Sequence, residues 1–206
     1  GRVGELLQDT MGFTVIGPNR FLGSGHPDIR EARDKGLPPH LGLIESTDAG
    51  ANWDSVSLLG EADFHVLRQA GEQVYGYDSS NDRLLVSEDQ GRRWETLKRP
   101  GPIVDLAVAP GESARIVTTS VGGGEDGLFE SRDGGRRWAR IGEAVGLLAW
   151  PAPAQLYLLT GDGRVLVSAD GGRRFESRGV IGGEPAALVA RHGAGGSVAA
   201  GGQAGG

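Results

Sequence analysis

The sequence predicts an all-β fold built from repeated four-stranded units, and three observations lead to this prediction. A short pattern, S-x-D-x-G-x-x-W/F, occurs four times along the 206 residues. Successive copies lie about 40 residues apart, which is the usual length of a four-stranded propeller blade. An apolar run precedes each copy, as in "LGLIE" and "RVLV", and a short alternating run such as "RRWETL" follows it. Each copy therefore marks a hairpin turn between two strands.

The residue types of the pattern suit a tight turn. Aspartate accepts hydrogen bonds from backbone N–H groups further along the turn, glycine adopts positive φ, serine adds a hydroxyl contact, and the aromatic residue buries apolar surface. We interpret the pattern as structural, because it recurs four times whereas chemistry needs one site. Its residues are Ser46, Asp48, Gly50 and Trp53; Ser87, Asp89, Gly91 and Trp94; Ser131, Asp133, Gly135 and Trp138; and Ser168, Asp170, Gly172 and Phe175.

Two further strands precede each turn, so we expect one β-propeller domain of about five four-stranded blades over residues 1–206. Residues 184–206 would form the inner strands of an incomplete fifth blade. Either residues 1–8 close that blade, or the chain is part of a larger, truncated ring. The complete blades are expected at about 12–58, 63–98, 103–141 and 145–178.

Composition excludes several classes of partner. The chain holds 21 basic and 27 acidic residues, a net charge of −6, which argues against nucleic-acid binding. No apolar run is long enough to span a membrane. Cysteine is absent, so disulfides and thiolate metal sites are excluded. We expect a monomer without a cofactor.

The repeated pattern resembles the Asp-box, or bacterial neuraminidase repeat, of sialidases, sortilin-type receptors and photosystem assembly propellers. More narrowly, the chain is similar to bacterial glycosyl hydrolase-like Asp-box proteins. That resemblance implies an extracytoplasmic setting, secreted or lipid-anchored. It is carried by "DTMGFTV", "RFLGSGHPD", "LGLIESTDAGANW", "LLGEADFH" and "VYGYD", in this order.

The resemblance does not extend to a sialidase active site. Sialidases need an arginine triad and carry a Phe/Tyr-Arg-Ile-Pro signature, which this chain lacks, and its arginines concentrate in the repeated turns as "GRRW" or "GRRF". A hydrolase that uses two carboxylates stays open, because it needs only two acidic groups at a suitable separation.

Propeller topology brings certain loops to the face opposite the repeated turns. The insertion "GHPDIREARDKGLPPH", residues 25–40, either caps the channel or projects as a recognition loop. Asp63, His65 and Asp105 are the catalytic candidates, while His40 and His192 are expected at the surface without a partner. The ligand-binding candidates on this face are His26, Asp28, Asp63, His65, Asp105 and Glu184.

Three interpretations of the group His26, Asp28, Asp63 and His65 stay open: structural hydrogen bonding, ligand binding or catalysis, and a metal site. We favour the first and expect no metal. The leading functional hypothesis is a non-catalytic binding or assembly scaffold for a protein or glycan. The alternative is a glycoside hydrolase that uses carboxylates on this face, and the third is a repeat module without a small-molecule site.

Overall fold

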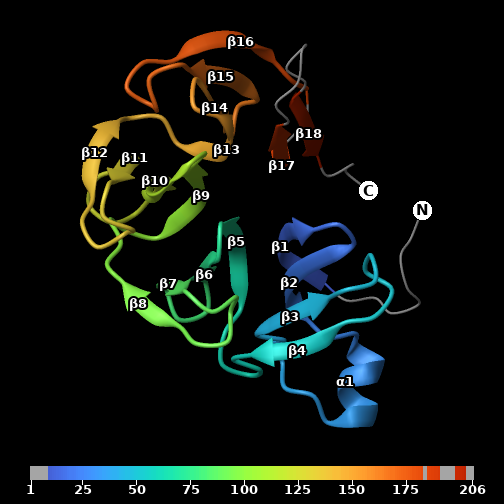
Figure 1. Cartoon of the computed structure of the whole chain (residues 1–206). Helices are drawn as coiled ribbons and strands as arrows, with labels where there is room; N and C mark the ends of the chain where they lie inside the picture. Colours follow the sequence, from blue (N-terminus) through green and yellow to red (C-terminus); the bar gives the residue numbers. More distant parts are fainter. Residues whose placement is uncertain (1–8, 183–184, 191–197, 203–206) are drawn as a thin grey trace. The chain divides into compact units, whose positions relative to one another are not determined.

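The computed structural model describes residues 9–182, 185–190 and 198–202 (Figure 1). The chain divides into two compact units, the first ending at Leu97 and the second beginning at Lys98. Each unit is described by itself. Apart from one short helix, the described elements are β-strands. No described helix has the length and apolar character needed to cross a membrane.

The first unit contains two antiparallel four-stranded sheets, each in sequence order. A helix, α1, interrupts the first sheet between its second and third strands. The first sheet and helix comprise β1 (Asp9–Gly17), β2 (Arg20–His26), α1 (Ile29–Lys35), β3 (Leu43–Ser46) and β4 (Asp54–Ser57). The second sheet comprises β5 (Phe64–Ala70), β6 (Gln73–Asp78), β7 (Arg83–Ser87) and β8 (Glu95–Leu97).

The second unit repeats this pattern and adds a two-stranded sheet, β17–β18. The third blade of the chain comprises β9 (Ile103–Ala109), β10 (Glu112–Ser120), β11 (Gly127–Ser131) and β12 (Ala139–Gly142). The fourth blade of the chain comprises β13 (Gly146–Ala152), β14 (Gln155–Thr160), β15 (Arg164–Ser168) and β16 (Glu176–Val180). The two-stranded sheet comprises β17 (Pro185–Ala190) and β18 (Val198–Gly202).

The prediction of an all-β fold with four-stranded blades is confirmed, but the number of about five blades is wrong. The structure forms four blades. Past the fourth blade, the described residues supply only the strand pair β17–β18, and this stretch carries no repeated turn to close a third and fourth strand. The predicted closing strand at residues 1–8 lies outside the described residues.

A buried serine organises each repeated turn, with the same contacts in all four copies. In the third blade, Ser131 Oγ accepts the N–H of Gly135 at 2.8 Å and donates to Asp133 Oδ1 at 2.9 Å. Asp133 Oδ1 also accepts the backbone N–H groups of Arg136 and Arg137, at 3.1 and 2.8 Å. The four serines, Ser46, Ser87, Ser131 and Ser168, are each 1% exposed.

The glycine of the repeated pattern lies against the preceding blade within each unit, as Gly91 and Gly172 show. Gly91 has φ +87°, and a Cβ there would stand 2.1 Å from Leu43 Cδ2 of the first blade. Gly172 has φ +96°, and a Cβ there would stand 2.9 Å from Leu128 Cδ2 of the third blade. The turn thus needs glycine both for its backbone conformation and for blade packing.

The aromatic residue of the turn also joins blades. Trp94 stacks near Phe64 with ring centroids 4.9 Å apart, and its Nε1 donates to Ser57 Oγ of the first blade at 3.0 Å. Phe64 and Leu43 are fully buried in the core of the first unit. The aromatic residue of this turn therefore contributes to the packing between the first and second blades.

Replacing Ser131 by alanine should lower the free energy of unfolding by about 1–3 kcal/mol, because the buried N–H of Gly135 loses its acceptor. Chemical denaturation followed by circular dichroism measures this change. Ser177→Ala, at an exposed serine on β16, is the matched control. Equal stability of the two variants would contradict the role given to the serine.

Acid should weaken the repeated turns. The backbone N–H and side-chain amide of Asn52 and the Ser46 hydroxyl lower the pKa of Asp48 from 3.8 to about 2. In the fourth blade, the backbone N–H of Arg174 is the main cause that lowers the pKa of Asp170. Since the unfolded chain binds protons more readily, this stabilisation is complete above about pH 4 and is lost toward pH 2.

The midpoint of thermal unfolding should therefore fall as the pH decreases from about 4 to about 2. Asp48→Asn should remove part of this dependence, whereas Asp54→Asn, at an exposed aspartate outside the turn, serves as the control. A pH profile of Asp48→Asn identical to that of the wild type would refute the assignment.

Candidate functional site

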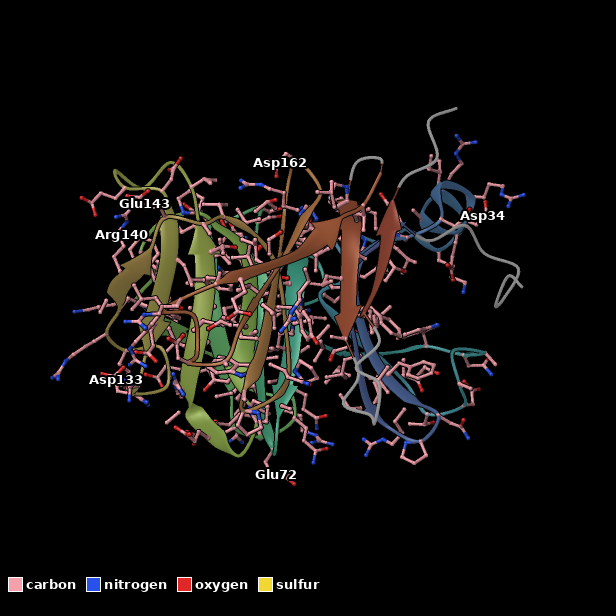
Figure 2. All side chains as sticks on the ribbon, turned by 90° about the horizontal axis from the view of Figure 1, so that it is seen from above. Asp34, Glu72, Asp133, Arg140, Glu143 and Asp162 are labelled. Atoms are coloured by element: carbon pink, nitrogen blue, oxygen red, sulfur yellow. The ribbon has the colours of Figure 1, made fainter. Side chains whose placement is uncertain are left out.

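The loops that leave the second strand of each blade lie at the edge opposite the repeated turns. In the second unit, Figure 2 shows Asp133 of a repeated turn at one edge and Asp162, between β14 and β15, at the other. Glu143, in the connection that enters β13, lies at the same edge as Asp162. We call this edge of each unit the loop face. The candidate site residues are predicted from the sequence to lie on this face.

In the first unit, the loop face carries the insertion that contains α1. Asp28 caps this helix: its buried carboxylate accepts the backbone N–H groups of Arg30 and Glu31 at 2.8 and 3.4 Å. The backbone N–H of Leu41 donates to Gly25 O at 2.9 Å, which closes the neck of the insertion. Asp28 therefore fixes the start of α1 and with it the first part of the insertion.

The neck of the insertion brings three potential ligand side chains together. His26 ends β2, His40 follows α1, and Asp63 immediately precedes β5. One ligand atom from each lies within 4.8 Å of the other two. His26 Nε2 is 3.6 Å from Asp63 Oδ2, and the rings of His26 and His40 have centroids 5.4 Å apart. We call these three residues the histidine–aspartate cluster.

His65, on β5, contacts the cluster from one side. Its Nε2 lies 3.0 Å from Asp63 Oδ2, and a carboxylate oxygen can only accept, so this nitrogen carries the proton. The side chains of His26 and His65 are 39% and 38% exposed, whereas that of Asp63 is 5% exposed. The cluster is thus anchored on the buried carboxylate of Asp63 and is open to solvent at His26, with the half-exposed His65 beside it.

The tautomer of His26 follows from its second nitrogen. Nδ1 lies 2.8 Å from Pro39 O, and a carbonyl oxygen can only accept, so Nδ1 carries the proton. In the neutral ring, Nε2 then has its lone pair directed at the cluster. The insertion that carries His40 thereby also orients His26.

Asp78, at the end of β6, holds the backbone of Asp63 in place. Its Oδ1 accepts the N–H of Asp63 at 3.1 Å, while its Oδ2 accepts Arg83 Nη2 at 2.6 Å and Asn81 Nδ2 at 2.9 Å. Ser79 N donates to Asp63 O at 3.0 Å. Burial raises the pKa of Asp78, but the hydrogen bonds from Asn81, Asp63 and Arg83 outweigh it and keep the pKa below its usual value.

Two buried polar atoms of the cluster have no hydrogen-bond partner among the described residues. They are His40 Nδ1 and Asp63 Oδ1. Buried polar groups are nearly always satisfied, so such atoms usually face a ligand, an ion or water. The cluster offers imidazole nitrogens and carboxylate oxygens, which can bind a cation or a hydrogen-bonding ligand.

Two predicted candidates, Asp105 and Glu184, are not among the residues of the cluster. Asp105, on β9 in the second unit, is 4% exposed, and its two oxygens accept the backbone N–H groups of Leu106 and Leu148, each at 2.8 Å. These contacts favour a structural role for Asp105. Glu184 lies outside the described residues. The expectation that His40 is a surface residue without a partner is wrong, because the neck of the insertion packs it beside His26.

Comparison with known proteins relates the chain to β-propellers. It superposes on YCF48 from Cyanidioschyzon merolae with a TM-score of 0.57 at 14% identity, covering 88% of this chain and 60% of that one. YCF48 bound to D1 peptide gives 0.55 at 14% identity, with coverages of 84% and 55%. A GH74 xyloglucanase from Xanthomonas campestris gives 0.56 at 17% identity, with coverages of 90% and 32%. At this identity the likeness shows the fold alone.

Sequence comparison adds little. No family model matches the chain. A stretch of 142 residues is 27% identical to a 1,4-alpha-glucan-branching enzyme of Candida glabrata, covering 63% of this chain and 19% of that protein. The chain therefore spans about a fifth of this curated relative and less than two thirds of each structural neighbour.

Asp78→Ala should lower the free energy of unfolding by about 3 kcal/mol, because it leaves a buried backbone N–H and an arginine without their acceptor. Hydrogen exchange should show a faster-exchanging amide at Asp63 in this variant. Asp54→Ala, at an exposed aspartate on β4, is the control. An unchanged exchange rate at Asp63 would show that Asp78 does not hold this segment.

Proposed function

We propose that the chain is a non-catalytic binding module that holds a protein ligand on the loop face of its first unit. The observation that carries this proposal is how the predicted carboxylates are hydrogen-bonded. Asp28 caps a helix, and Asp105 accepts two backbone N–H groups. Among the predicted carboxylates that the structure describes, Asp63 alone keeps an oxygen without a hydrogen-bond partner.

A glycosidase generally needs two working carboxyl groups about 5–9.5 Å apart. The carboxylates of Asp28 and Asp105 are engaged by the hydrogen bonds that hold their own loops and strands. A group of this kind is poorly suited to exchange a proton with a substrate. This arrangement favours binding over hydrolysis.

Exposed aliphatic side chains near the cluster favour a protein ligand. Ile29, the first residue of α1, is 79% exposed, and Leu59, in the loop before β5, is 43% exposed. The N–H of Gly60 donates to His40 O at 2.9 Å, so the Leu59 loop is tied to the cluster. Exposed aliphatic side chains of this kind would supply apolar area to a protein interface. The neighbour YCF48, solved with a bound peptide, uses the same fold for binding.

The alternative is a glycoside hydrolase with Asp63 as one of its carboxylates. It is supported by the unpaired oxygen of Asp63 and by the fold shared with a GH74 xyloglucanase. For either function, the extracytoplasmic setting that the Asp-box resemblance implies remains part of the proposal.

Binding should depend on the loop face. Peptides selected from a random display library on the immobilised protein should bind Ile29→Asp at least tenfold more weakly than the wild type, because the substitution puts a charge into an apolar contact. Val180→Asp, at a 70% exposed valine on β16, is the matched control. Equal weakening by both substitutions would move the binding surface away from α1.

Hydrolysis is tested on the same preparations. Aryl glycosides and xyloglucan oligosaccharides should remain uncleaved by the wild type. Turnover that disappears in Asp63→Asn and persists in Asp34→Asn, at an exposed aspartate on α1, would replace the binding module with the hydrolase.

A further inference from the structure

We propose that His26, His40 and Asp63 form a binding site for a divalent transition-metal ion of the zinc class. This inference is independent of the proposed function, since it rests on the donor atoms alone. It also departs from the sequence-based expectation of no metal, because the contact between His26 and His40 arises only in the fold.

The spacing of the donors fits a first coordination shell. Zinc–nitrogen and zinc–oxygen bonds of about 2.0–2.1 Å at tetrahedral angles place neighbouring donors about 3.3 Å apart. His26 Nε2 and Asp63 Oδ2 are 3.6 Å apart, and all three donors lie within 4.8 Å of one another. The donors therefore lie within about 1.5 Å of the ideal spacing, and a bound ion would draw them together.

The unsatisfied atoms supply a second and independent observation. His40 Nδ1 and Asp63 Oδ1 are buried without a hydrogen-bond partner among the described residues. Leaving two such atoms unpaired in one cluster costs folding free energy that a bound cation would recover. A nitrogen lone pair and a carboxylate oxygen are the groups that such an ion uses.

The surroundings orient the donors as metal sites require. The Nδ1–H of His26 donates to Pro39 O, so the lone pair of Nε2 is the one that can bind the metal ion. His65 Nε2 donates to Asp63 Oδ2 at 3.0 Å, so we assign His65 as a positioning residue rather than a ligand. Asp78 fixes the backbone of Asp63.

The chemistry of the set selects the ion. Two imidazoles with one carboxylate suit zinc, iron, nickel and copper, whereas magnesium and calcium prefer oxygen ligands throughout. Three protein ligands leave a fourth position for water or for a donor group of a bound partner. The cluster reaches solvent through His26, whose side chain is 39% exposed.

The test uses untagged protein freed of metal with a chelator. Equilibrium dialysis against Zn²⁺ should load one ion per chain with a dissociation constant below about 1 μM, and Co²⁺ should give the intense visible absorption of a four-coordinate site. Excess Mg²⁺ or Ca²⁺ should not displace either ion. Failure to bind, or equal competition by Ca²⁺, would overturn the proposal and leave water as the partner of the unpaired atoms.

Variants locate the ion. His40→Ala and Asp63→Asn should each weaken Zn²⁺ binding at least 100-fold, while the matched control Asp34→Asn, on the exposed surface of α1, should bind as the wild type does. Circular dichroism confirms that each variant is folded. Unchanged affinity in both cluster variants would place any bound zinc elsewhere and refute this site.

The role of His65 has its own readout. His65→Ala should weaken Zn²⁺ binding about tenfold and alter the Co²⁺ spectrum, as removal of an outer-shell hydrogen bond does. His65→Gln, whose amide can donate to Asp63, should restore part of the affinity. A tenfold loss that glutamine does not relieve would contradict the hydrogen-bonding role assigned to His65.

Discussion

The hydroxyl group of one buried serine per blade is the contact on which the rest of the structure depends. It accepts the N–H of the pattern glycine and donates to the turn aspartate in all four blades. This fixes the glycine at positive φ against the preceding blade, as Gly91 against Leu43 shows. A local hydrogen bond thereby sets both the hairpin and the packing of neighbouring sheets.

The loop face inherits its geometry from this packing. Within the first unit, Ser24 Oγ on β2 accepts the N–H of Phe64 at 3.0 Å, which joins the end of one blade to the start of the next. His26 lies two residues beyond this serine, and Asp63 lies one residue before Phe64. The contact between blades therefore brings the histidine and the carboxylate into one cluster, although they belong to different sheets.

The repeated turn pattern made most of the fold predictable from the sequence. The features that the sequence did not predict lie where this pattern is interrupted or ends. The four turns and the strands around them follow from a pattern that recurs with its spacing. The helix α1 interrupts the repeat, yet "DIRE" carries a usable signal: an aspartate cap with glutamate three residues later. The fifth blade was overpredicted because an apolar strand pair without its turn resembles half a blade.

The candidate site was only partly predictable. His26, Asp63 and His65 were placed on one face by topology, and the structure brings them together. His40 was missed because a backbone hydrogen bond across the neck of the insertion, rather than any sequence periodicity, brings it beside His26. Topology predicted Asp105 on the loop face, but its position in the sequence does not reveal that both of its carboxylate oxygens accept backbone N–H groups.

The hydrogen bond between Leu41 and Gly25 separates the insertion into two parts with different freedom to evolve. Residues at the neck are hydrogen-bonded to the blade. The residues between the two sides of the neck form a closed loop, and the entropy cost of closing such a loop rises only slowly with its length. The tip can thus be lengthened, shortened or exchanged while the blade keeps its register.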